Sequence, residues 1–321
     1  MKKKTLLYLG AAAIGAAASA YVALYLRQQA LLMNARADVA RQNYLDEFAV
    51  QDRYTNILGC DTHYYIAGSP DPKGFIHSAP LRDASRNPSG LFPPLVMLHG
   101  GVIEAATFLD NIKCLAQDRL VIAPDMPMHG RSSFLSPHRT LEWFNAFIDS
   151  MGLDQFDLCA HSTGGGIAAR YALQHPQRVR RLILCAPTGF GNTFPRIFFM
   201  PSLARFTDDV IEYVWGEPDR LTTQQRHYFD LILKEFFSSG RWWWYLSGGF
   251  LWMLDLPTTS LRQLHTPTLV LWGERDRLVP LNREAISLLP NAHLRLFTNA
   301  GHVVYMEARE EFDKAVNEWL R

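Results

Sequence analysis

A serine set among small residues is the feature of this sequence that could do chemistry most directly. Ser162 follows an apolar run that ends at Ala160, and it precedes Gly164, Gly165 and an Ala-rich helical sequence. This order predicts a strand, a sharp turn and a helix, with the hydroxyl lifted clear of the sheet at the apex. The backbone N–H of Thr163 would then face whatever the hydroxyl attacks. A buried serine at an ordinary strand–helix junction is the alternative interpretation.

A serine nucleophile needs two further groups, because its hydroxyl is a poor nucleophile at neutral pH. It needs a base within hydrogen-bond reach, and the base needs a group that fixes its tautomer. His302, which follows a glycine near the end of the chain, is the candidate base. Asp276 is the candidate orienting group, and Glu274 is a competing carboxylate in the same loop. We favour Asp276, because it is the later acid of that loop.

Backbone N–H groups that could hold a developing oxyanion are expected after the strand at residues 95–101, which ends in His-Gly-Gly. Glycines let the backbone turn so that its N–H groups face the negative charge. We place the second donor at Gly101, with Val102 as the alternative. His99 could act as a base, but we interpret it as a brace for this loop. His161, beside the serine, is expected to support the site without touching substrate.

Strands and helices alternate through most of the chain after residue 50. The pattern predicts a mostly parallel sheet with helices on both faces, in which active groups gather beyond the carboxyl ends of the strands. Ser162, Asp276 and His302 all follow expected strands, in that chain order. A hairpin at 53–58 and 63–67 comes first; the later strands are expected at 95–101, from 120, at 156–160, 181–186, 267–273 and 293–297, and helices at 104–116, 140–151, 281–288 and 310–321.

The alternation stops between residues 187 and 258, where aromatic residues crowd the sequence. We interpret this stretch as a helical cap inserted into a core made of residues 50–186 and 259–321. Most of its rings should pack against each other, and a subset should line an apolar substrate cavity or touch lipid. The rings are Phe190, Phe194, Phe198, Phe199, Phe206, Tyr213, Trp215, Phe236, Phe237, Trp242, Trp243, Trp244, Tyr245, Phe250 and Trp252.

The N-terminus has the composition of a membrane anchor. Three lysines at positions 2–4 precede an uncharged stretch, residues 5–26, which would span about 33 Å as a helix, enough for a bilayer core. The basic start predicts a cytoplasmic N-terminus, with the catalytic domain on the non-cytoplasmic side, the periplasm if the protein is bacterial. A cleaved signal ending at Ala18-Ser-Ala20 and a soluble helix are the alternatives. Residues 27–49 have the mixed charge of a linking helix.

Composition excludes several classes of protein. The formal net charge of +1 over 321 residues gives no reason to expect a nucleic-acid partner. The four cysteines form no Cys-x-x-Cys pair, so neither a disulfide scaffold nor a zinc site is expected. No metal or cofactor is required by the chemistry above. Residues 69–94 are rich in Pro, Gly, Ser and Asp and are expected to form a long surface excursion.

Five motifs together resemble the α/β-hydrolase superfamily from about residue 50 to the end. Within it, the sequence is most similar to the lipase and monoacylglycerol-lipase-like branch that carries an N-terminal membrane helix. The Cys-Ala-Pro-Thr-Gly-Phe190 and Gly-His-Val-Val-Tyr-Met-Glu307 stretches support that placement. The five motifs are Leu-His-Gly-Gly101, Pro124-Asp-Met-Pro-Met-His-Gly-Arg-Ser132, Ala160-His-Ser-Thr-Gly164, Trp272-Gly-Glu-Arg-Asp276 and Gly301-His302.

The resemblance implies a Ser–His–Asp hydrolase acting on esters of fatty acids, a lipase or monoacylglycerol-type esterase.

Two residues depart from the superfamily's pattern. Ala160 stands where glycine is common, which the need for a small residue allows. Met128 stands where a turn glycine is usual, which leaves that loop's conformation open. Ser162 argues against relatives that open epoxides or remove halides, because those use an aspartate. Two alternatives stay open: a carbon–carbon bond hydrolase of ring-cleavage products, and a catalytically silent binding protein.

Overall fold

The structure is a computed structural model that describes residues 36, 38–39, 50–68, 92–191, 206–239, 241 and 256–321. The predicted membrane anchor, residues 1–26, lies outside the described residues. So do most of the predicted linking helix, most of the excursion at 69–94 and the cap segments 192–205 and 242–255, which contain many of the cap's aromatic residues.

The predicted hairpin opens the sheet. Strands β1 (Gln51–Ile57) and β2 (Cys60–Ala67) pair antiparallel, with Ile57 opposite Cys60. The turn at Leu58 and Gly59 takes positive φ angles of 55° and 84°. Strand β1 is largely exposed and β2 is largely buried. This difference follows from position, because β1 lies at the edge of the sheet and β2 pairs with strands on both sides.

Six further strands complete an eight-stranded sheet in the order β1-β2-β4-β3-β5-β6-β7-β8. All of the later strands run parallel to one another, and β2 pairs antiparallel with β4. The prediction of a mostly parallel sheet is therefore confirmed. The inner strands are largely buried, as sheets covered on both faces require, whereas the last strand lies at the edge of the sheet and is mostly half-buried. Short apolar runs in the sequence form all six. They are β3 (Leu95–Leu98), β4 (Val121–Pro124), β5 (Phe156–His161), β6 (Val179–Cys185), β7 (Thr268–Gly273) and β8 (Ala292–Phe297).

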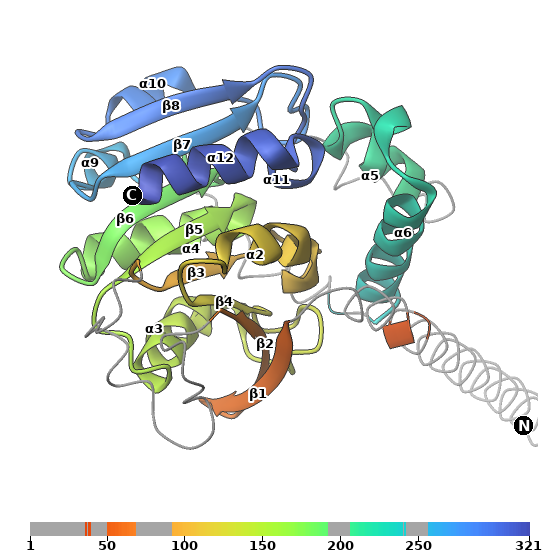
Figure 1. The fold of residues 1–321 in the computed structure, drawn as a ribbon, viewed down its shortest axis with the longest axis horizontal. Helices are drawn as coiled ribbons and strands as arrows, with labels where there is room; N and C mark the ends of the chain where they lie inside the picture. The colour runs from red at the N-terminus through yellow and green to blue at the C-terminus, as the bar shows by residue number, and fades with distance from the viewer. Residues whose placement is uncertain are drawn as a thin grey trace, which may run out of the picture.

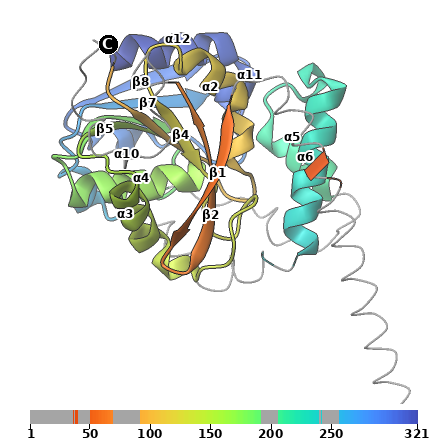
Figure 2. The ribbon, with the colours of Figure 1, turned by 60° about the horizontal axis from the view of Figure 1, so that its bottom comes forward.

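Helices cover both faces of this sheet. Figure 2 shows α2, α11 and α12 on one face and α3, α4 and α10 on the other. The predicted helix at 104–116 is divided into a 3-10 turn, η2 (Ala105–Phe108), and α2 (Leu109–Leu115). The others are η3 (Pro137–Arg139), α3 (Thr140–Ser150), α4 (Ser162–Gln174), α9 (Thr258–Leu261), α10 (Arg283–Ser287), α11 (Val304–Glu307) and α12 (Arg309–Leu320).

Two local conformations explain residue choices near the sheet edge. A Cβ on Gly164 would lie 2.4 Å from the backbone oxygen of His99, so only glycine lets α4 start this close to the end of β3. Met128, which replaces a usual turn glycine, has a positive φ of 70° and is buried. The loop therefore keeps the conformation that favours glycine, at the cost of backbone strain in a residue with a side chain.

The described part of the cap is helical. It consists of α5 (Phe206–Val214), the 3-10 turn η5 (Pro218–Arg220) and α6 (Thr223–Ser238). A capping box starts α6, in which the side chains and backbone N–H groups of Thr222 and Gln225 bond reciprocally. In Figure 1, α5 and α6 (teal) lie beyond the ends to which the arrows of β7 and β8 point. The cap thus lies at the edge where active groups of such sheets gather.

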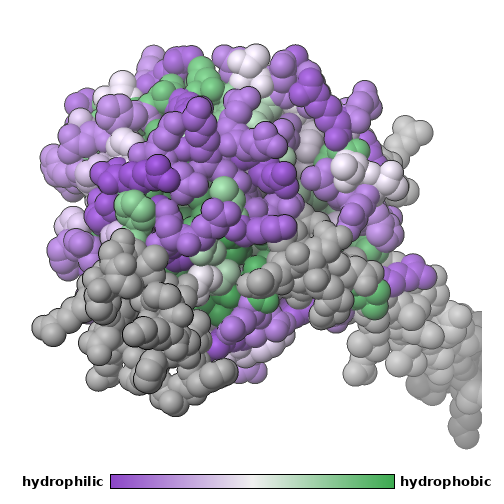
Figure 3. Space-filling view, in the orientation of Figure 1, coloured by the Kyte–Doolittle hydropathy of each residue, from purple (hydrophilic) through white to green (hydrophobic). Residues whose placement is uncertain are grey.

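The described surface is mostly polar. Figure 3 shows hydrophilic side chains over most of the described part of one face, with hydrophobic side chains exposed in small areas. Phe134 and Tyr54 are among the few large apolar side chains that are more than half exposed. No helix within the described ranges is both long enough and apolar enough to cross a membrane.

Candidate active site

Ser162 sits at the turn between β5 and α4, as the sequence predicts. It is the first residue of α4 and has a positive φ of 52°, which is uncommon for a residue with a side chain. The N–H of Thr188, in the loop after β6, donates to the Ser162 carbonyl at 3.0 Å and holds the turn in place. Strained backbone of this kind persists only where the surrounding structure determines it, and it clusters at functional sites.

His302 and Asp276 meet at the same edge of the sheet. His302 Nδ1 and Asp276 Oδ2 are 2.8 Å apart, and both side chains are almost fully buried. The other carboxylate oxygen, Oδ1, accepts the N–H groups of Leu278 and Val279 at 2.9 and 2.8 Å. Because an ionised carboxylate can only accept, His302 Nδ1 must carry the proton. His302 Nε2 then has a free lone pair and can take a proton from a nucleophile.

Four of the five predicted site residues line one small cavity of about 50 Å³, beneath the cap. They are Gly101, Ser162, Thr163 and His302, and the fifth, Asp276, reaches it through His302. No Lys, Arg, Asp or Glu is among the described residues around this cavity. Apart from His161, the remaining lining is apolar: Val102, Ile103, Val210, Val214, Trp215, Phe229, Leu233, Leu278 and Val303.

The two predicted oxyanion donors lie on different loops of this cavity. Thr163 is the second residue of α4, and the first N–H groups of a helix have no acceptor within it. Gly101 follows β3, and the next residue, Val102, has a positive φ of 59°. A β-branched residue in that region is a backbone outlier. Val102 and Ser162 both have a positive φ, and both line this cavity. Backbone strain of this kind clusters at functional sites, so it supports a binding role for the cavity.

The two other histidines of the site have supporting roles. His99 Nε2 accepts the N–H of Met126 at 2.8 Å, and its Nδ1 donates to the Gly100 carbonyl at 2.7 Å. These two bonds confirm the interpretation of His99 as a brace for the loop. Burial lowers the pKa of the His99 imidazole. His161 Nε2 donates to the His302 carbonyl at 3.0 Å, beneath the candidate base. Burial also holds the pKa of His161 well below its usual value, with the nearby His302 as the next cause.

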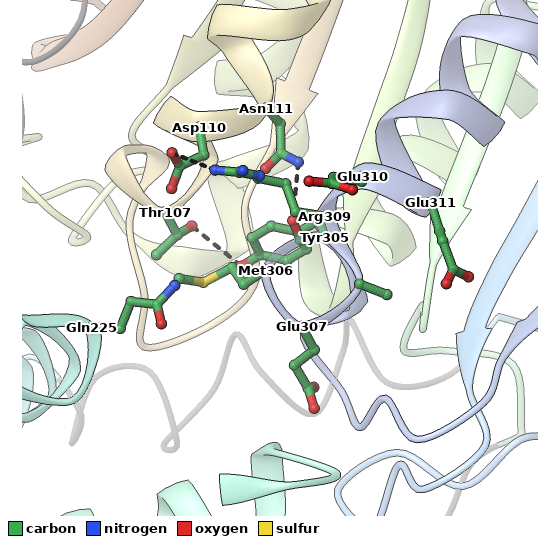
Figure 4. A pocket seen from close by; sticks show the side chains of 11 residues that line it. Thr107, Asp110, Asn111, Gln225, Tyr305, Met306, Glu307, Arg309, Glu310 and Glu311 are labelled. Carbon is green, nitrogen blue, oxygen red and sulfur yellow. Dashed lines mark hydrogen bonds and ion pairs between the residues drawn. The ribbon is translucent and has the colours of Figure 1, made fainter. Parts of the chain in front are cut away.

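A larger and more polar groove of about 430 Å³ lies elsewhere, between α2, α6 and the start of α12. Figure 4 shows Asp110 paired with Arg309, and Thr107 bonded to Tyr305, along its wall. No triad candidate lines it, so it is separate from the cavity at Ser162. Across the described ranges, no group of three or more His, Cys, Asp or Glu side chains is placed to hold a metal ion.

Comparison with known proteins agrees with the fold. Residues 93–230 match the family described as alpha/beta hydrolase fold. A carboxylesterase structure from Bacillus subtilis superposes with a TM-score of 0.72 at 21% identity, covering 90% of this chain and 98% of the other. The chain has the α/β-hydrolase fold. The structure of a membrane phospholipase A matches 100% of this chain and 98% of that protein, at a TM-score of 0.67 and 22% identity.

Curated relatives of this chain include proteins with different reactions. A 2-hydroxymuconate semialdehyde hydrolase of Pseudomonas putida is 29% identical over 71% of this chain and 86% of its own length. An acetyltransferase component of the acetoin cleaving system from Cupriavidus necator is 27% identical over 70% of this chain. The chain spans only 63% of that second protein. The two relatives therefore differ in the reactions that their names describe.

Three residues near the site have neighbours that the sequence does not predict. Phe229, on α6, lines the cavity beside Trp215, although only Trp215 is among the cap rings singled out above. The Tyr228 hydroxyl of the same helix bonds the buried Glu104 carboxylate at 2.6 Å, just after the Gly101 loop. Glu307 contacts the loop of His302. Residues 225, 228, 229 and 232 have the spacing of one face of a helix, which could have indicated the inner face of α6. The residues that this face contacts could not be predicted from the sequence.

Proposed function

We propose that this α/β-hydrolase is a serine hydrolase that cleaves carboxylic esters with an apolar acyl part, a lipase or monoacylglycerol-type esterase. The observation that carries the proposal is the shared cavity of Ser162 and His302, whose remaining walls are mostly apolar. An ester places a small polar group at the reacting atoms and needs only apolar walls for its acyl chain. The structural likeness to a carboxylesterase supports the same chemistry.

The proposed reaction gives each site residue a role. His302 Nε2 takes the proton of Ser162 as its oxygen attacks the ester carbonyl, and the N–H groups of Thr163 and Gly101 hold the oxyanion. The protonated His302, stabilised by Asp276, returns the proton to the leaving alcohol. A water molecule, deprotonated by His302, then attacks the acyl-enzyme, which releases the carboxylic acid and restores Ser162.

Graded esters test the proposal. We expect kcat/KM for p-nitrophenyl esters to rise from acetate to medium-chain acyl groups, because each buried methylene adds about 0.8 kcal/mol, or about fourfold, of binding. Hydrolysis is followed by release of p-nitrophenol. A flat series, or a preference for acetate, would count against an apolar acyl site.

Carbon–carbon bond hydrolysis is the second candidate, because two relatives act on ring-cleavage products. Such dienoate substrates carry a carboxylate, for which no Lys or Arg stands among the described lining residues. A dienoic ketoacid assayed beside a medium-chain ester separates the two reactions: turnover of the ketoacid alone would replace the ester proposal. If neither is turned over and a fluorophosphonate does not label Ser162, the third alternative, a silent binding protein, holds.

A membrane location forms part of the proposal. It rests on the lysines at positions 2–4 and the uncharged residues 5–26, and the similarity to a membrane phospholipase A over the whole chain supports it. The catalytic domain is then held outside the cytoplasm. We expect external protease to digest the domain in spheroplasts, and carbonate washing to leave the intact protein in the membrane fraction. Protection of the domain from protease would contradict the orientation.

A further inference from the structure

One carboxylate holds both residues that flank the candidate base. Glu307 is the last residue of α11, and its Oε1 accepts the N–H of Gly301 at 2.9 Å and that of Val303 at 3.3 Å. These two residues precede and follow His302. The position of the imidazole along this loop is therefore fixed from both sides by one oxygen atom.

The second oxygen of the same carboxylate reaches the cap. Glu307 Oε2 accepts the N–H of Gly216, just after α5, at 2.7 Å. In Figure 4, Glu307 points toward the cap and away from the polar groove's other labelled side chains. Cap and loop also meet directly, because the His302 N–H donates to the Val214 carbonyl at 2.6 Å.

The contact between cap and loop is a close packing of backbone on backbone. A Cβ on Gly301 would lie 2.4 Å from Gly216 N, and one on Gly216 would lie 2.5 Å from the Asn299 oxygen. Arg275 adds an ion pair to Glu217 at 2.7 Å and a hydrogen bond to Asn299. Displacement of residues 214–217 would therefore move the loop that carries His302.

Only a carboxylate suits this position. Its two oxygens face N–H donors on opposite sides, whereas an amide offers one accepting oxygen and one donating nitrogen. Burial raises the pKa of Glu307, and the N–H groups of Gly301, Gly216 and Val303 oppose that effect. A glutamine at this position must point its NH₂ group at either Gly216 or Gly301, so that one side of the link is lost.

We propose that Glu307 is a positioning residue that sets the place of His302 and couples it to the cap. The inference rests on the proposed function, since it gives His302 its role as base. The cavity of about 50 Å³ is smaller than the roughly 300 Å³ or more of ordinary ligand sites, and residues of α5 and α6 form part of its wall. The Glu307 link makes any widening that displaces Gly216 also move His302.

Glu307→Gln tests the inference in the full-length protein. The second-order rate constant for labelling of Ser162 by a fluorophosphonate probe reports activation of the serine without needing an ester substrate. We expect labelling per folded molecule to fall about tenfold to hundredfold, the order that a misplacement of about 1 Å can cost. On a p-nitrophenyl ester, kcat should fall with little change in KM.

Two matched variants show whether the effect is specific. Asp313→Asn likewise replaces a buried carboxyl group with an amide, on α12. Asp313 accepts a hydrogen bond from Asn111, and within the described part of the chain its hydrogen bonds reach neither the His302 loop nor the cap. Glu310→Gln changes an exposed acid in the polar groove of about 430 Å³ that Glu307 also lines. Both should label at the wild-type rate per folded molecule. An equal loss in Asp313→Asn would reduce the role of Glu307 to general stability and overturn the inference.

Failure of the inference and failure of the proposed function give different results. If wild-type protein labels rapidly but cleaves no ester, the ester proposal fails while the comparison of labelling rates still tests Glu307. If Glu307→Gln labels within twofold of wild type, the positioning role is wrong. Should that variant not fold, Glu307→Asp, whose shorter side chain cannot span Gly301 and Gly216 together, replaces it with the same expected loss, and an unchanged rate overturns the inference.

Discussion

Replacing Ser162 with alanine should reduce ester hydrolysis to background, a loss of about 10⁴-fold or more, while the protein stays folded. The hydroxyl oxygen is the atom that forms the acyl-enzyme, and no other serine lines the cavity within the described residues. Alanine carries the same backbone strain at a φ of 52°, so the turn between β5 and α4 should form as before. Release of p-nitrophenol measures the rate, and circular dichroism measures folding.

Ser150→Ala is the matched control. Its hydroxyl donates to the Phe147 carbonyl at the end of α3, away from the cavity, so activity should stay near wild type. The Ser162→Ala variant should also fail to react with a fluorophosphonate. If the Ser162→Ala protein keeps the wild-type turnover rate, Ser162 is not the nucleophile for any substrate, and the proposed mechanism is excluded.

Asp276→Asn should lower kcat by about 10⁴-fold, the order found when the orienting acid of such a triad is made neutral. The physical reason is the direction of the hydrogen bonds. Asp276 Oδ1 accepts two backbone N–H groups, from Leu278 and Val279, so the asparagine oxygen will take that place. The NH₂ group then faces His302 Nδ1, 2.8 Å from the present Oδ2. His302 is thereby forced to accept at Nδ1 and to carry its proton on Nε2, where it cannot receive one from Ser162.

Glu274→Gln separates the two carboxylates of this loop. Glu274 is exposed, and Asp276 is the acid bonded to His302, so the Glu274 variant should keep activity within a few-fold of wild type. Both variants are measured by kcat on one medium-chain ester, with thermal unfolding as the check on folding. A large loss for Glu274→Gln with full activity for Asp276→Asn would reverse the assignment.

Much of the fold could be predicted because it depends on local pattern. Short apolar runs such as residues 95–98 and 268–273 are typical of strands that are buried on both faces in a covered parallel sheet. Where the strand–helix alternation stops, the described elements are α5, η5 and α6, which are helical as expected for this stretch. Boundaries were less exact: the helix expected at 104–116 begins as the 3-10 turn η2, and α11 was not anticipated.

The sequence by itself determined the chemistry available to this protein: a serine in a tight turn, a histidine and an aspartate, each following its own strand. Loops after parallel strands meet at one sheet edge, so chain order alone brought these groups into one neighbourhood. Only the tertiary structure decided which neighbours they have. Trp215 and Phe229 line the cavity, and Glu307 joins the His302 loop to Gly216, 91 residues away in the chain. Such contacts depend on how the cap packs against the sheet edge. The spacing of residues along the sequence does not predict that packing, because the contacting residues are far apart in the chain.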